Sequence, residues 1–161
     1  GDELIKMANS NFNLVSRLEQ KSILINIILS YKPLGFTLYQ AINLASNLAN
    51  LFNELAAEQI NIKALDDLSD FDSASHWQEI NAFLQYAYEK FSNKLKQRNK
   101  IDYANQRNNL LQAEINKLNY KKPDAPIFVI GSTGSIKIVR KFINALLQHD
   151  SCYIIMIISR A

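Results

Sequence analysis

The sequence contains few of the residues that build disulfides, metal sites and loops. Its 161 residues include one cysteine, two histidines, three prolines and four glycines. The single cysteine, Cys152, excludes an intramolecular disulfide and a multi-cysteine metal site, and it favours a reducing cytoplasm as the compartment. So few glycines and prolines leave little loop and predict much helix. We expect neither a cofactor nor a metal.

Long apolar runs and a leader-like start are also missing. Two apolar runs, residues 22–29 and 152–159, are too short to span a bilayer. The first residues lack the basic-then-apolar layout of a signal peptide. Apolar residues nevertheless make up 48% of the chain, which is enough for a sizeable core. We therefore expect a soluble cytoplasmic protein without a membrane partner.

The two halves of the chain carry opposite net charge. Residues 1–88 contain five Lys/Arg and ten Asp/Glu, a net charge of −5. Residues 89–161 contain thirteen and five, a net charge of +8. This asymmetry indicates either a polyanionic partner, such as DNA, or attraction between the two halves.

Apolar residues recur at three- and four-residue steps over most of the first 120 residues, as they do in amphipathic helices. Thr37 and Asp102 are suitable N-caps for the second and fourth helices, and Ser73 or Ser75 for the third. The helices are expected over residues 14–31, 38–56, 76–95 and 103–119. The expected inner positions are Leu38, Ala41, Ile42, Ala45, Leu48, Ala49, Phe52, Leu55 and Ala56 in the second helix, and Trp77, Ile80, Leu84, Ala87, Phe91 and Leu95 in the third.

Two prolines within residues 121–126 forbid helix and mark a linker. The sequence thus predicts a mainly α-helical, bundle-like subdomain over residues 1–122 and a small α/β unit over 123–161. In the second part, buried-type strands over 127–130 and 152–158 flank a helix over 135–148, which is a βαβ unit. Ile138, Val139, Phe142, Ala145 and Leu146 are expected on the inner face of that helix.

Two parallel strands bury too little surface to stand alone. The unit is therefore expected to be incomplete. The unpaired apolar strand 152–158 is an edge at which a second copy of the chain could pair, giving a homo-oligomer.

The segment GSTGS, residues 131–135, follows the first of these strands. Backbone N–H groups at a helix start attract anions, and Ser132, Thr133 and Ser135 add hydroxyls. A phosphate loop, however, requires a lysine directly after its second glycine, whereas Lys137 comes three residues after Gly134. A plain turn with a serine cap, a nucleic-acid phosphate contact and a nucleotide pocket are the three interpretations of this segment.

Basic residues cluster between residues 90 and 122. Such a cluster is either a solvated helix face or a surface that binds a phosphate backbone. For nucleic-acid binding we select Lys94, Lys96, Arg98 and Arg107, together with Ser132, Thr133, Ser135 and Lys137.

No constellation of residues looks catalytic. His76 has no neighbouring metal-ligand pattern, and the acidic cluster at residues 66–72 does not match a calcium loop. Trp77 is expected in the core, with its indole N–H paired locally.

Residues 51–68, 76–84, 101–111 and 126–146 occur in an order and at a spacing that look familiar. Together they resemble the alphaproteobacterial AddB family, the second subunit of the AddAB helicase–nuclease of double-strand break repair. The more specific ones are the GSTGS strand-turn-helix and the Arg107-Asn108 pair. The resemblance implies a helicase-like architecture in which the helical part is an inserted subdomain and the βαβ unit begins a partial RecA-like domain. It also implies DNA and an AddA-like subunit as partners. The resemblance further implies that the remaining strands of the sheet belong to sequence outside this chain.

The chain departs from that family in lacking a phosphate loop, a nuclease motif and a cysteine set for an iron–sulfur cluster. We therefore expect an internal, non-catalytic fragment of an AddB-like protein with a structural and DNA-backbone-contacting role in recombinational repair, and no enzyme activity. The alternative is a stand-alone helical interaction module, or an inactive gene remnant, that self-associates.

Overall fold

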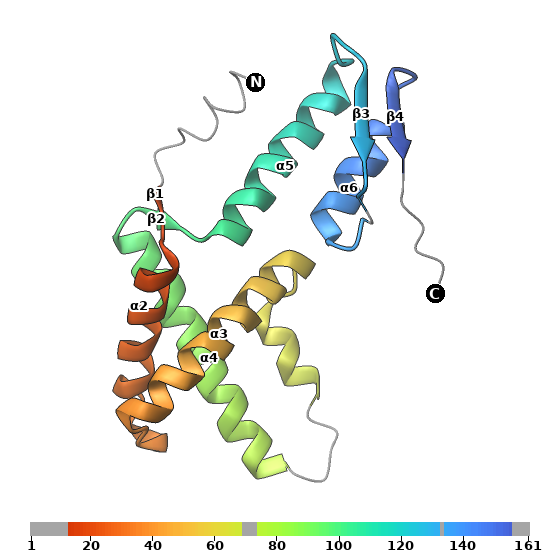
Figure 1. The fold of residues 1–161 in the computed structure, drawn as a ribbon. Coiled ribbons are helices and arrows are strands. Elements are labelled where there is room, and N and C mark those ends of the chain that lie inside the picture. Colours follow the sequence, from red (N-terminus) through yellow and green to blue (C-terminus); the bar gives the residue numbers. More distant parts are fainter. Residues whose placement is uncertain (1–12, 69–73, 133, 156–161) are drawn as a thin grey trace.

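The computed structural model describes residues 13–68, 74–132 and 134–155, and most of these residues are helical (Figure 1). The mainly helical fold is therefore confirmed. Its elements are β1 (Asn13–Leu14), α2 (Arg17–Ser30), η1 (Lys32–Leu34), α3 (Leu38–Glu58), η2 (Ile62–Leu68), α4 (Ala74–Gln97), β2 (Lys100–Ile101), α5 (Tyr103–Tyr120), β3 (Ile127–Ile130), α6 (Lys137–Leu146) and β4 (Cys152–Ile155).

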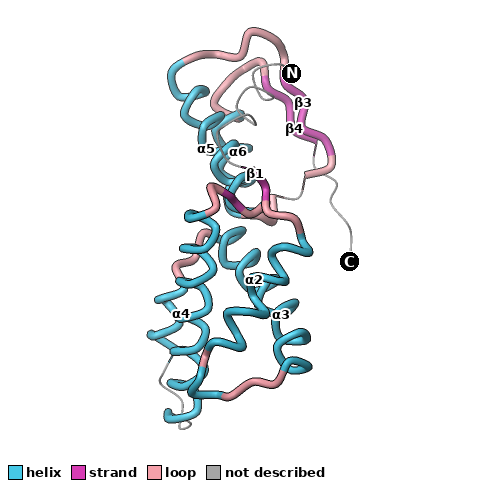
Figure 2. The backbone as a smooth tube through the Cα atoms, turned by 90° about the vertical axis from the view of Figure 1, so that its left-hand side faces the viewer, coloured by secondary structure: helices cyan, strands magenta, loops and turns pink. Residues whose placement is uncertain are grey.

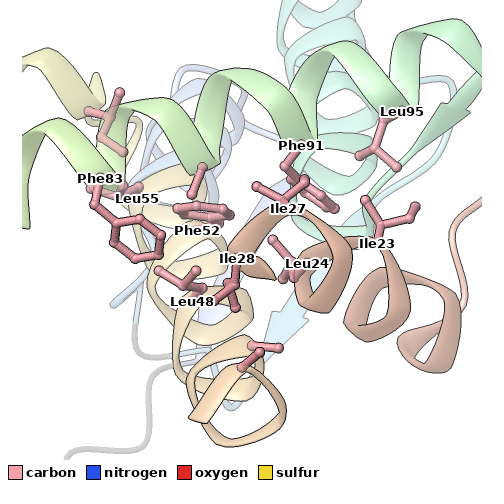
Figure 3. Packing of buried hydrophobic residues seen from close by; sticks show 14 of the residues in the cluster. Ile23, Leu24, Ile27, Ile28, Leu48, Phe52, Leu55, Phe83, Phe91 and Leu95 are labelled. Carbon is pink, nitrogen blue, oxygen red and sulfur yellow. The ribbon is translucent and has the colours of Figure 1, made fainter. Parts of the chain in front are cut away.

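Three helices, α2, α3 and α4, enclose the main hydrophobic core, and η2 adds Ile62 to it. Leu24 and Ile28 of α2 are fully buried and pack toward Leu48 and Phe52 of α3, with Phe91 of α4 alongside (Figure 3). Burying a side chain of this size stabilises the fold by roughly 1.5–3 kcal/mol. This core fixes α2 and α4 relative to each other.

The predicted N-caps of the second and fourth helices are confirmed. Thr37 forms a capping box with Gln40, and each residue's side chain accepts a hydrogen bond from the other's backbone N–H. The carboxylate of Asp102 accepts from the backbone N–H of Asn105 at 2.9 Å and from its side-chain amide at 2.7 Å. Ser73 and Ser75, the expected caps of α4, lie outside the residues whose side chains are described.

The first helix begins later than its periodicity predicts. Residues 13–14 form β1, which pairs in parallel with β2 in the register Asn13 to Lys100 and Leu14 to Ile101. Ser16 then caps α2 by accepting from the backbone N–H of Glu19 at 3.1 Å. The β1–β2 pair therefore ties the start of α2 to the turn between α4 and α5.

The predicted inner faces of α3 and α4 are confirmed in part. In α3 the prediction is wrong for Leu38 and Ile42, in the first turns of the helix, which are exposed. Ala87, Phe91 and Leu95 of α4 are buried, as predicted, and Trp77, Ile80 and Leu84 are half-buried. The prediction of a paired indole N–H is wrong for the residues that the structure describes, among which the buried Nε1 of Trp77 has no hydrogen-bond partner.

The βαβ unit has the predicted parallel pairing, with Ile127 opposite Cys152 and Ile130 opposite Ile155. The helix α6 covers one face of the β3–β4 pair, and α5 packs against α6 across the predicted domain boundary (Figures 1 and 2). The assignment of this unit to a RecA-like domain stays a prediction. Residues 156–158 of the expected second strand lie outside the described residues.

The expectation of strands buried on both faces is wrong. Exposure alternates along each strand, because α6 covers one side of the pair and the other described elements leave the opposite side exposed. The uncovered face presents Phe128, Ile130, Tyr153 and Ile155, each more than half exposed, and the rings of Phe128 and Tyr153 stack with centroids 5.0 Å apart.

The helix α6 starts at Lys137 instead of Ser135, and its N-cap residue Ile136 offers no side-chain hydrogen bond. Its buried positions are Ile138, Ile143 and Leu146, whereas Val139, Phe142 and Ala145 are half-buried. The inner face is thus rotated from the predicted one because α5, as well as the sheet, packs on it. Over the described ranges, none of the helices has the length and apolar character needed to cross a bilayer.

Candidate nucleic-acid interface

A groove of about 640 Å³ runs between α2 and α4. Lys90 and Lys94 of α4 line it, and Arg98 lines it directly after the end of that helix. Residues four apart lie about 6 Å apart along one helix face, so the three cations form a row along the groove. The α2 side supplies hydroxyl and amide groups from Ser16, Ser22, Asn26 and Ser30.

At one end of the groove, Lys90 contacts an aromatic ring. The ammonium Nζ of Lys90 lies 5.6 Å from the centroid of the Tyr86 ring, a cation–π distance. The hydroxyl of Ser30 donates to the carbonyl of Ile27 at 2.7 Å. Because that hydroxyl has a single hydrogen, the Tyr86 hydroxyl is the donor in the 3.1 Å bond between Tyr86 and Ser30. This bond joins α4 to α2 beneath Lys90.

At the other end of the groove, a carboxylate forms ion pairs with two cations. Glu19 of α2 pairs with Arg98, whose Nη1 lies 3.0 Å from Oε1, and with the ammonium of Lys100. The hydrogen bond from Lys100, followed by that from Arg98, lowers the pKa of Glu19 below its ordinary value of 4.5. Glu19 therefore stays ionised at neutral pH and takes up part of the charge of Arg98.

The charged residues that line the groove are the three cations and Glu19, so their net charge is +2. The remaining lining is mostly hydroxyl and amide groups, with Leu18 and two buried isoleucines. Such a surface can contact phosphate oxygens by charge and hydrogen bonds without reading base edges.

The structure does not bring the sequence-predicted site residues together. Lys94 and Arg98 line the α2–α4 groove, whereas Lys96 lines a hollow of about 810 Å³ bounded by η2, α4 and α5. Arg107 lines a third hollow, between α2, α3 and α5. Ser132 and Ser135 belong to the connection from β3 to α6, Lys137 is the first residue of α6, and Thr133 lies outside the described residues.

The described residues of the GSTGS segment form hydrogen bonds within their own chain. Gly131 and Gly134 have φ values of 75° and 61°, in the left-handed region that favours glycine. The backbone N–H of Gly134 donates to Ser132 Oγ at 3.4 Å. Arg140 of α6 donates back to the carbonyls of Gly134 at 3.0 Å and Ser135 at 3.3 Å. Ser135 does not cap the helix, whose N-cap residue is Ile136; both the plain turn and a phosphate contact here stay predictions.

Sequence reasoning selected Lys94 and Arg98 for the site but left out Lys90, Tyr86 and Glu19. The four-residue step from Lys94 back to Lys90 was a signal that could have added Lys90. Nothing in the sequence pairs Glu19 with residues about eighty positions later, and that contact needed the fold. Among the described residues, no group of three or more His, Cys, Asp or Glu side chains is placed to hold a metal ion.

Comparison with known proteins finds similar segments in much longer chains. An uncharacterized protein of Rickettsia typhi is 32% identical over 117 residues, which is 73% of this chain and 13% of that protein. An uncharacterized protein of Rickettsia conorii is 31% identical over 104 residues, or 65% of this chain and 12% of that protein. The chain therefore spans only about an eighth of the length of the curated relatives it matches. No family model and no solved structure matches it.

Proposed function

We propose that this chain is a non-catalytic, DNA-contacting segment of an AddB-like subunit, and that the α2–α4 groove binds the phosphate backbone. The observation that carries the proposal is the row of Lys90, Lys94 and Arg98 along one polar groove. A row of cations without base-reading geometry suits sequence-independent backbone binding.

Two further findings agree with the chain being a piece of a larger protein. The curated relatives are several times longer than the matched segment. Among the described residues, nothing covers one apolar face of the parallel β3–α6–β4 unit, and a further layer supplied by sequence outside this chain would bury that face. In that setting an AddA-like subunit is the expected protein partner.

The structure also bounds how strongly the groove can bind. Each phosphate that a cation neutralises on a single strand contributes about −0.7 to the slope of log K against log salt. Lys90 and Lys94 alone give a slope of about −1.4, and full engagement of Arg98 brings it to about −2.1. We therefore expect weak, salt-sensitive and sequence-independent binding.

The test is fluorescence anisotropy with a labelled junction of single-stranded and duplex DNA, titrated at several salt concentrations. Lys94→Gln should weaken binding and make the slope shallower by roughly 0.7–0.9, the value of one phosphate contact. Lys122→Gln, an exposed cation that follows the end of α5 and does not line the groove, is the matched control and should bind like the wild type. Equal losses in the two variants would show that binding depends on net charge and not on the groove.

A second candidate function is self-association, which the uncovered face of the β3–β4 pair favours. Its four apolar side chains and stacked ring pair form the kind of contiguous patch that marks an interaction site. In this account the isolated chain forms a homo-oligomer, and Phe128→Lys converts it to a monomer. Analytical ultracentrifugation over a range of concentrations tests this function. A chain that stays monomeric at every concentration would rule out self-association.

A further inference from the structure

The hollow between α2, α3 and α5 contains two buried donors that lack partners. It has a volume of about 540 Å³, and both Gln20 of α2 and Arg107 of α5 line it. The side-chain amide nitrogen of Gln20 and the guanidinium Nε of Arg107 are buried, and neither has a hydrogen-bond partner in the part of the chain that the structure describes. Gln20 as a whole is only 8% exposed.

Unpaired donors of this kind are rare because they are unfavourable. Most buried polar groups in proteins are hydrogen-bonded, and a buried donor without a partner loses its hydration without compensation. Because two such donors line one hollow, a ligand that accepts hydrogen bonds from both would relieve the cost of burying them. A single group with several acceptor oxygens would satisfy both.

Arg107 presents an edge that is suited to an oxyanion. Its Nε and Nη2 form the fork that binds two oxygens of one carboxylate or phosphate. Among the described residues Nε has no partner, and Nη2 donates to the side-chain oxygen of Asn108 at 3.5 Å. Asn108 in turn donates to the carbonyl of Ala56 at 2.6 Å, which fastens α5 to the end of α3. The guanidinium of Arg107 therefore belongs to a helix, α5, whose position relative to α3 is fixed by this hydrogen bond.

The other residues that line the hollow indicate which chemical groups a ligand would carry besides an oxyanion. Arg17 adds a second cation and Glu54 one carboxylate, so the charged side chains of the hollow sum to +1. Leu14 and Tyr103 give apolar and aromatic surface, and both are exposed. The volume lies in the range of sites for small organic ligands and exceeds what a lone inorganic ion fills.

We propose that this hollow binds a small organic oxyanion, a phosphate or a carboxylate attached to an apolar or aromatic group. The oxyanion lies on the Arg107 fork and the Gln20 amide, and the organic part lies against Tyr103 and Leu14. In the free protein both nitrogens are covered, so the terminal torsions of Gln20 and Arg107 turn when the ligand enters. Those torsions are soft, with broad minima.

The binding test uses the whole chain with phenyl phosphate, benzoate and benzyl alcohol as probes, in two-dimensional NMR titrations with isothermal calorimetry. Phenyl phosphate, benzoate or both should bind with shifts centred on Gln20 and Arg107, and their relative affinity identifies which oxyanion the site prefers. Benzyl alcohol, which has no charge, should bind far more weakly. Equal binding of all three probes, or binding of none, would overturn the proposal.

Variants give a second readout that a purely structural role would not produce. Gln20→Leu and Arg107→Met should each weaken binding of the preferred probe about ten- to hundredfold, the effect of one charge-assisted hydrogen bond. The free variants should melt at or above the wild-type temperature, because each substitution removes an unpaired buried donor. Should Arg107→Met fail to fold, Arg107→Lys keeps the charge, removes the fork and is expected to lose affinity in the same way.

Lys32→Met is the charge-matched control and should bind the probe like the wild type. Lys94→Gln should do so as well, which separates this site from the α2–α4 groove and keeps the two proposals independent. Wild-type affinity in both Gln20→Leu and Arg107→Met, or a large loss of stability in both without ligand, would contradict the assignment.

Discussion

Removing one negative charge from the α2–α4 groove should strengthen DNA binding. Glu19 pairs with Arg98 at 3.0 Å and with Lys100, so it competes with phosphate for the third cation of the row. Glu19→Gln keeps the size of the side chain and removes that competition. The net charge of the groove lining then rises from +2 to +3, and Arg98 becomes free to contact a phosphate.

The size of the effect follows from the number of phosphate contacts. With Lys90 and Lys94 alone, a slope of about −1.4 predicts a roughly sevenfold loss of affinity for single-stranded DNA between 50 and 200 mM salt. With Arg98 released, a slope of about −2.1 predicts a roughly 18-fold loss over the same range. The variant should therefore bind more tightly at low salt and converge on the wild type as salt increases.

The assay is anisotropy with a labelled single-stranded oligonucleotide at four or more salt concentrations. Glu58→Gln is the matched control, because Glu58 is an exposed carboxylate at the end of α3 and does not line the groove. It changes the net charge of the protein by the same amount. If both variants steepen the slope equally, or if Glu19→Gln makes it shallower, the reasoning about Arg98 is refuted.

Three further predictions concern stability. Gly134→Ala should destabilise the fold by about 1–2 kcal/mol in urea melts, since φ is +61° there while an added Cβ would meet only ordinary contacts of 3.8 Å or more; an unchanged midpoint would contradict this. Asp102→Ala should cost about 1–2 kcal/mol through loss of the α5 cap, and Asp102→Asn, which keeps an acceptor oxygen, much less. Because the folded-state pKa of Glu19 is lowered, its contribution is present above pH 4.5 and is lost as pH falls through that lowered value. Chemical melts between pH 3 and 7 should thus show a stability difference between wild type and Glu19→Gln that shrinks at the acid end, and a constant difference would argue against the pairing.

The helices were predictable where local chemistry determines them. Periodic apolar residues and the caps Thr37 and Asp102 mark α3 and α5 in the sequence. The β1–β2 pair was not predictable, because two residues per strand carry no periodic signal. The start of α6 was predicted too early, because the sequence offers Ser135 as an N-cap. In the structure Arg140 donates hydrogen bonds to the carbonyl groups of Gly134 and Ser135, and the helix begins at Lys137.

The candidate site was predictable only in part. Lys90 and Lys94 lie one turn apart, and their common face follows from the sequence. Lys96, two residues after Lys94, is about 200° further around the helix, which places it on the other side of α4. Whether α2 covers one of these faces, and whether Glu19 meets Arg98, depends on helix packing that no local pattern encodes. The uncovered face of β3 and β4 was missed because continuous apolar strands are normally buried on both sides.

The most direct test of the central proposal maps a short single-stranded oligonucleotide onto the chain by two-dimensional NMR at low salt. We predict amide and side-chain shifts at Lys90, Lys94 and Arg98 and, across the groove, at Ser22 and Asn26, all of which disappear as salt is raised. Shifts confined to the β3–α6 turn, or their absence at low salt, would contradict the assignment of DNA binding to the α2–α4 groove.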